Sequence, residues 1–168
     1  MNTEHLESWG ADWLWGVPLI LVTVMIQVHA LSFLKRQADQ RMSYIYKHHT
    51  LSVGSVTLSI TILHAFEAVL WAGTFLFLGA VPDPRTAMLY SLNALTAFGH
   101  TDVNLEKQWQ LMGALESLNG WILFGLSTAY IFGLIQRIWA QPLRESQAAV
   151  DAVTKALTIS GSVTDRAD

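Results

Sequence analysis

The clearest chemical signal in the chain is the spacing of four polar residues that lie in predominantly apolar stretches of the sequence. His64 and Glu67 are three residues apart, and so are Glu116 and Asn119. Residues at this spacing share one face of a helix, and a rise of about 1.5 Å per residue puts Glu67 and Asn119 at similar depth. A carboxylate in an apolar segment is costly unless it faces protein or water. The pattern predicts an intramembrane polar cluster. This cluster either senses protons or lines an ion pathway, or it joins helices by hydrogen bonds.

These residues do not predict a metal centre or a catalytic site. A His and a Glu at this spacing occur in di-iron helical bundles, but such sites need several more carboxylates. Glu116 is the one further carboxylate in these apolar segments, and the absence of Cys removes thiolate metal sites and cysteine nucleophiles. The sequence contains no recognisable pairing of a nucleophile with a base and no cofactor-binding loop. We therefore expect a protein that is not an enzyme and holds no cofactor.

The elements that must position the polar residues are membrane spans. The 168 residues are 52% hydrophobic and 14% charged, with a mean hydropathy of +0.34, whereas soluble domains carry about a quarter charged residues. A net charge of −3 provides no basic surface for nucleic acid. Crossing a bilayer takes about 20 helical residues, and three apolar stretches are long enough: 13–34, 51–79 and 111–138. The predicted fold is an all-α membrane protein with three transmembrane helices.

The remaining segments have distinct characters. Within 80–110, the apolar residues 86–98 are too few to cross a membrane, and they predict a helix that enters and leaves on the same side. The tail, 139–168, has apolar residues at heptad-like positions after Pro142. This pattern predicts a solvated amphipathic helix, with a helical bundle beneath a symmetric pore as the alternative.

Basic residues predict the orientation of the spans. The linker 35–50 contains Lys35, Arg36, Arg41 and Lys47, whereas residues 1–12 contain no Lys or Arg. Because cytoplasmic loops are enriched in Lys and Arg, we expect a multi-pass protein of the cell membrane with its N-terminus outside and its tail in the cytoplasm. The acidic start lacks the basic region of a signal peptide, so the first span is expected to be a retained anchor rather than a cleaved signal.

The segment from Thr86 to Asp102, TAMLYSLNALTAFGHTD, resembles the pore helix and selectivity filter of potassium channels. The filter of that family reads Thr-Thr-Val-Gly-Tyr-Gly-Asp, and Thr96, Gly99 and Asp102 match it. Trp109 recurs at the family's spacing after the Asp. The resemblance extends from Leu51 to about Ile138, and the closest likeness is to bacterial two-span pores with an extra N-terminal helix.

The resemblance implies a homotetramer in the lipid bilayer, with a cation pathway on the shared axis. It assigns the filter and ion pathway to Thr96, Ala97, Phe98, Gly99, His100, Thr101 and Asp102. It assigns support of the filter to Asn93, Tyr90 and Trp109, with a hydrogen bond expected between Asn93 and Asp102. The run around Phe124-Gly125-Leu126 is similar to the family's inner helix, with Gly120 and Gly125 at hinge positions.

The departures from the family pattern predict weak selectivity. Thr101 stands where the second filter glycine would be, and a β-branched residue in a left-handed conformation costs about 1–2 kcal/mol. Ala97 lacks the hydroxyl that would face the innermost ion. We expect a cation channel that discriminates poorly between K⁺ and Na⁺, or a pore selective for another ion. The alternative is a non-conducting structural or regulatory subunit in which this loop is collapsed.

Overall fold

The computed structural model describes residues 3–41, 44–45, 48–98 and 105–164. Its elements, in chain order, are α1 (Thr3–Gln40), α3 (His49–Phe77), α4 (Pro84–Leu95), the short 3-10 helix η1 (Lys107–Trp109) and α5 (Gln110–Thr164). No strand occurs in the part of the chain that the structure describes. The prediction of an all-α chain is confirmed.

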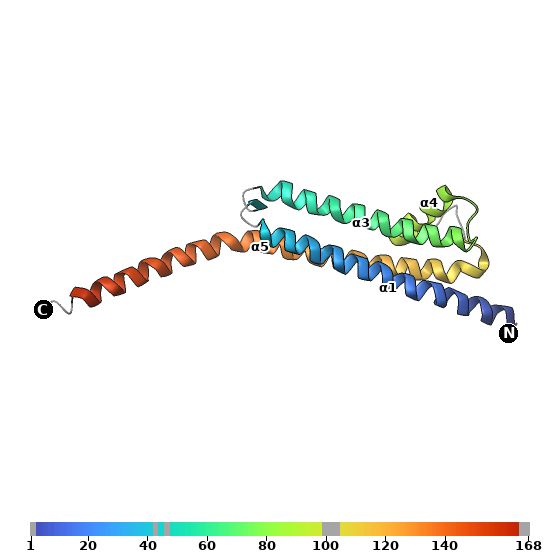
Figure 1. The fold of residues 1–168 in the computed structure, drawn as a ribbon, viewed down its shortest axis with the longest axis horizontal. Helices are drawn as coiled ribbons and strands as arrows, with labels where there is room; N and C mark the ends of the chain where they lie inside the picture. The colour runs from blue at the N-terminus through green and yellow to red at the C-terminus, as the bar shows by residue number, and fades with distance from the viewer. Residues whose placement is uncertain (1–2, 42–43, 46–47, 99–104, 165–168) are drawn as a thin grey trace. The chain divides into compact units, whose positions relative to one another are not determined.

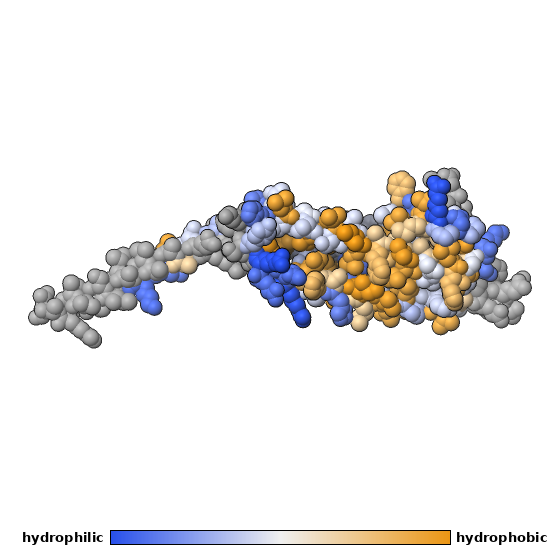
Figure 2. Space-filling model, turned by 45° about the horizontal axis from the view of Figure 1, so that its top comes forward, coloured by the Kyte–Doolittle hydropathy of each residue, from blue (hydrophilic) through white to orange (hydrophobic). Residues whose placement is uncertain are grey.

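Three of these helical segments have the length and apolarity needed to cross a membrane. They are Gly10–Gln40, His49–Phe77 and Lys107–Ala140. The prediction from composition is therefore confirmed at the level of three candidate spans. Figure 2 shows a broad band of hydrophobic side chains, with hydrophilic side chains on either side of this band. Such a band is what lipid chains would cover.

The chain divides into two compact units, residues 1–131 and residues 132–168. The first unit holds α1, α3, α4, η1 and the first part of α5. Within this unit, α1 and the first part of α5 run in the same direction, and α3 runs antiparallel to both (Figure 1). The second unit is formed by the remainder of α5, which is helical to Thr164.

Two helices extend beyond the apolar stretches that predict them. α1 continues past residue 34 to Gln40, so the first part of the expected linker is helical. α5 continues past residue 138, through Pro142, to Thr164. Loss of apolar character marks where a helix leaves an apolar environment, and it does not by itself end the helix. The sequence boundaries therefore fall inside the observed helices.

α4 begins at a well-formed N-terminal cap. The carboxylate of Asp83 accepts hydrogen bonds from the Thr86 main-chain N–H at 3.0 Å and from the Thr86 hydroxyl at 2.6 Å. Pro84 occupies the first helical turn, where the missing N–H of proline has no consequence. These two residues explain why a helix starts here, directly after the turn that follows α3.

An aromatic core holds α4 at one end of the bundle. Trp71 and Phe75 of α3 are fully buried, and the Phe75 ring meets the Tyr90 ring of α4 edge to face with centroids 5.3 Å apart. Ala87 and Ala94 are also buried, so the α4 backbone approaches its neighbours closely. Fully burying a large apolar side chain contributes about 1.5–3 kcal/mol. The core therefore fixes the position from which the segment after α4 departs.

Candidate functional site

The expected filter starts at the C-terminal end of α4. The Thr96 hydroxyl donates to the Leu92 carbonyl at 2.7 Å, within its own helix. The Ala97 N–H donates to the Ala94 carbonyl and the Phe98 N–H to the Asn93 carbonyl, both at 3.0 Å. These two bonds make a Schellman motif, in which glycine usually occupies the left-handed position. Here Ala97 occupies it, with φ 53°.

The first residues of the expected filter therefore form the C-terminal cap of α4. This differs from the strand-like path of aligned carbonyls that the resemblance implies. Phe98 follows with an exposed side chain. The filter residues Gly99, His100, Thr101 and Asp102 lie outside the described residues, and so does the expected bond from Asn93 to Asp102. The resemblance predicts a left-handed conformation at the position of Thr101, whereas the left-handed conformation at Ala97 was not predicted.

The chain returns to its starting point after the filter region. The Glu106 N–H donates to the Ala80 carbonyl at 3.3 Å, which joins the segment after the loop to the segment before α4. Leu105 is buried in the same core as Ala80. Ala80 and Glu106 thus lie together at one end of the bundle, and α4 lies between them in the sequence.

Glycines on α5 let α4 pack closely against it. A Cβ at Gly113 would overlap the Tyr90 hydroxyl, and a Cβ at Gly120 would overlap the main-chain carbonyl of Leu95. The two glycines are seven residues apart and share a face of α5. The resemblance predicts a hinge at Gly120, and the observed contact gives this residue a packing role, whereas a Cβ at Gly125 would meet open space. The sequence does not predict the role of Gly113.

The other two expected support residues lie in or against the core. Tyr90 is buried against Phe75, and its hydroxyl lies over Gly113. Trp109, in η1, is partly buried against the same core, and its indole N–H has no hydrogen-bond partner among the described residues. Both residues therefore anchor in one core the chain on either side of the expected filter.

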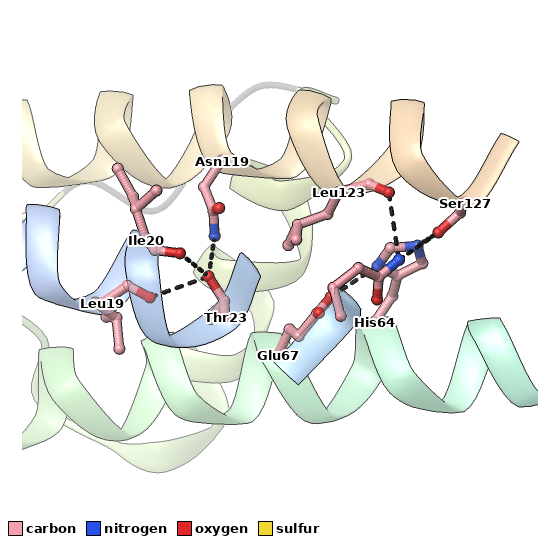
Figure 3. Close-up of polar contacts among 9 residues, drawn as sticks. Leu19, Ile20, Thr23, His64, Glu67, Asn119, Leu123 and Ser127 are labelled. Carbon is pink, nitrogen blue, oxygen red and sulfur yellow. Dashed lines mark hydrogen bonds and ion pairs between the residues drawn. The ribbon is translucent and has the colours of Figure 1, made fainter. Parts of the chain in front are cut away.

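His64 is the centre of a polar network that links all three long helices (Figure 3). Its Nδ1 lies 2.8 Å from Glu67 Oε2, and its Nε2 lies 3.1 Å from the Ser127 hydroxyl of α5. The Gln27 amide of α1 donates to that same hydroxyl at 2.6 Å. One consistent set of directions runs from Gln27 to Ser127, from Ser127 to the imidazole, and from Nδ1–H to Glu67.

Asn119 makes a second contact between helices. Its amide donates to the Thr23 hydroxyl of α1 at 2.8 Å, and that hydroxyl donates in turn to main-chain carbonyls one turn earlier in α1. The Gln27 amide also reaches the Leu123 carbonyl at 3.4 Å. The predicted four-residue cluster is therefore divided: Glu67 pairs with His64, and Asn119 pairs with a residue of the first span.

Glu116 stands apart from both contacts. It is fully buried, and its carboxyl lies near the Ser91 hydroxyl of α4. Neither carboxyl oxygen has a partner at hydrogen-bonding distance in the described part of the chain. Further out, the buried carboxyl of Asp12 lies near the Met112 N–H, at the start of α5.

Sequence reasoning missed the network partners that α1, α4 and α5 supply, which are Thr23, Gln27, Ser91 and Ser127. It also missed the buried carboxyl of Asp12. A usable signal existed in α1, because Thr23 and Gln27 are four residues apart in an apolar span and so share a face. Hydroxyl residues such as Ser127 carry no comparable signal, since spans commonly satisfy them with their own backbone.

Among the described residues no group of three or more His, Cys, Asp or Glu side chains is placed to hold a metal ion. The arrangement contains side chains of types that can bind and release protons, and donors and acceptors that join helices. No protein-family model, curated protein or solved structure matches the chain. Its function is therefore inferred from its own residues.

Proposed function

We propose that four copies of this chain form a cation channel, with α4 and the segment after it at the mouth of a shared axial pore. The observation that carries this proposal is the return of the chain at Glu106 to Ala80. Between them stands a helix of 12 residues, too short to cross a bilayer. A short helix between two spans, entered and left at one end, is the geometry of cation-channel pores.

The fit of α4 to its own chain supports this arrangement. Gly113 and Gly120 bring α4 against α5, while Leu89 and Leu92 on its other side are exposed. Irregular backbone at membrane depth is tolerated where protein or water covers it. Neighbouring copies around a shared axis would supply that cover, and lipid would surround the assembly.

Charge supports the orientation. Lys35, Arg36 and Arg41 are exposed at the C-terminal end of α1, which favours a cytoplasmic position for that end in a multi-pass cell-membrane protein. α4 lies at the opposite end of the bundle (Figure 1). The pore mouth would therefore face outward, and K⁺ or Na⁺ would enter there.

The cap at Ala97 supports weak selectivity. Strong K⁺ selectivity needs successive carbonyls aligned on the pore axis, whereas the main chain at Ala97 and Phe98 turns back to bond α4. The same cap also favours a second candidate function, a non-conducting membrane subunit that assembles through the same helices.

Bi-ionic reversal potentials of the purified full-length protein in planar bilayers separate these functions. A cation channel of this kind should pass Na⁺ and K⁺ with permeabilities within roughly tenfold of each other, and should migrate in detergent as a four-chain particle. Strong K⁺ selectivity would contradict the role given to Ala97. A four-chain particle with no conductance above protein-free bilayers would assign the second function.

A further inference from the structure

A row of polar groups follows one face of α5. Side chains of other helices meet it at residues 112, 116, 119, 123 and 127. Steps of three and four residues keep these positions on one side of the helix. The row covers about 22 Å of helix at 1.5 Å per residue, most of a hydrocarbon core that is about 30 Å thick.

The buried oxygens of this row lack hydrogen-bond donors. Six such oxygens have no partner in the described part of the chain: Asp12 Oδ1, Gln27 Oε1, Glu67 Oε1, Asn119 Oδ1 and both oxygens of Glu116. All six accept hydrogen bonds, and burying an acceptor unpaired is costly. Water donates two hydrogen bonds and commonly satisfies buried polar groups that have no partner in the protein. The row is therefore suited to a file of water molecules.

Proton-binding groups recur along the same row and come from every element that lines it. Asp12 belongs to α1, Glu116 to α5, and Glu67 and His64 to α3, while Tyr90 of α4 also faces Glu116. Figure 3 shows Glu67 between the Thr23–Asn119 pair and His64 along the bundle. Carboxylates and imidazoles both take up and release protons.

We propose that this row is a proton-transfer pathway within a single chain, separate from the shared axial pore. A proton enters at Asp12, passes through water to Glu116 and then to Glu67, and crosses the 2.8 Å hydrogen bond to His64. Because Nδ1 receives this proton, the pathway uses the imidazole tautomer with its hydrogen on Nε2, the reverse of the directions given for the resting network, and that hydrogen then passes from Nε2 to the Ser127 hydroxyl oxygen. Each group on the route gains one proton and loses one: Ser127 releases its own hydroxyl hydrogen to water as it takes the hydrogen of Nε2, and the imidazole regains its Nε2–H tautomer before the next proton arrives.

Leu123 sets the rate of this pathway. It is fully buried, and its side chain lies opposite Glu67, between Asn119 and Ser127 (Figure 3). An apolar side chain at this point excludes the water that would join Glu116 to Glu67. Leu123→Ala should admit that water, which makes the proposal testable by a gain of flux as well as by a loss.

The experiment uses the full-length protein in liposomes with an enclosed pH dye, an imposed pH gradient, and a potential clamped with valinomycin and equal K⁺. Leu123→Ala should raise the initial proton flux at least about tenfold over the native chain. Adding Glu67→Gln or Glu116→Gln to that variant should remove the gain. Glu116→Asp, which keeps a carboxyl group, should retain it. Glu106→Gln, the same chemical change at an exposed position, is the matched control and should leave the gain unchanged.

Na⁺ flux measured in the same vesicles separates this pathway from the proposed channel. If the pathway is separate, adding Glu67→Gln to Leu123→Ala should abolish the gain in proton flux, while the Na⁺ flux of the same vesicles stays unchanged. Equal fractional loss of both fluxes would place protons in a shared pore and overturn the proposal. Proton flux that is insensitive to both Glu→Gln changes, or absent from Leu123→Ala, would overturn it as well. Each variant is first shown to keep the native melting temperature and detergent particle size, and Glu116→Gln provides the test if Glu67→Gln fails to fold.

Discussion

Ala97 is a residue at which the chain accepts a conformation that its side chain disfavours. Its φ of 53° ends α4 in the left-handed region, where a Cβ meets the following carbonyl at a cost of about 1–2 kcal/mol. Ala97→Gly removes that contact, although the more flexible unfolded chain offsets part of the gain. We expect the variant to raise the free energy of unfolding by about 0.5–1 kcal/mol, as measured by reversible unfolding in mixed detergent.

Ala94→Gly is the matched control for this prediction. Ala94 lies inside the same helix and is buried, so glycine there should lower the free energy of unfolding by about 1 kcal/mol. Destabilisation by Ala97→Gly of similar size would show that the left-handed conformation is not the one adopted in the membrane.

The residue scale also shows where sequence reasoning ends. The apolar segments revealed that His64 and Glu67 share a face, and the two side chains are 2.8 Å apart. Counting residues placed Glu67 at the depth of Asn119, yet Asn119 bonds Thr23. Such counting along separate helices gives depth but not rotation, and rotation decides which partner a buried amide meets. The partner from α1 therefore stayed hidden, although the spans themselves follow from length and apolarity.

The N-terminal cap of α4 gives that element a dependence on pH. The hydroxyl and the main-chain N–H of Thr86 donate to the Asp83 carboxylate and hold its pKa below the usual value of 3.8. A lowered pKa means that the charged cap stabilises the fold above pH 3.8, and that this stabilisation is lost as pH falls through the folded-state value. Asp83→Asn keeps an acceptor without a charge, so it should melt below the native protein at pH 7, with the difference vanishing in strong acid.

Melting curves of the two proteins between pH 7 and pH 2.5 check this prediction. Thr86→Val removes the hydroxyl donor, and in that background Asp83→Asn should lower the melting temperature by less at pH 7. A difference between the native protein and Asp83→Asn that persists unchanged at pH 2.5 would show that the charge of Asp83 is not what stabilises the start of α4.

At the scale of the whole molecule, the first span is part of the bundle. Thr23 and Gln27 of α1 bond Asn119 and Ser127 of α5, so the first span is bonded to the third span at two levels. Hydrogen bonds of this kind between membrane helices contribute about 0.6 kcal/mol on average and up to about 1.7 kcal/mol. A double-mutant cycle of Thr23→Val and Asn119→Leu should give a coupling energy in that range by reversible unfolding.

Thr57→Val combined with Asn119→Leu is the control cycle. Thr57 is exposed on α3, and its hydroxyl bonds its own helix, so these two changes should be additive to within about 0.5 kcal/mol. If the cycle with Thr23 is equally additive, α1 is held by apolar packing and lipid alone.

The bonds between α1 and α5 also set an order of events during synthesis. Their partners are separated by 96 and 100 residues, which a ribosome adds in about 5–20 s at 5–20 residues per second. During that interval the Thr23 hydroxyl is already satisfied by carbonyls of its own helix. Gln27 has its interhelical partners only on α5 among the described residues. In a newly inserted α1, the Gln27 side-chain amide therefore lacks these interhelical partners. A carbonyl or hydroxyl of a chaperone or of a second nascent chain would compete with α5 for hydrogen bonding to this amide.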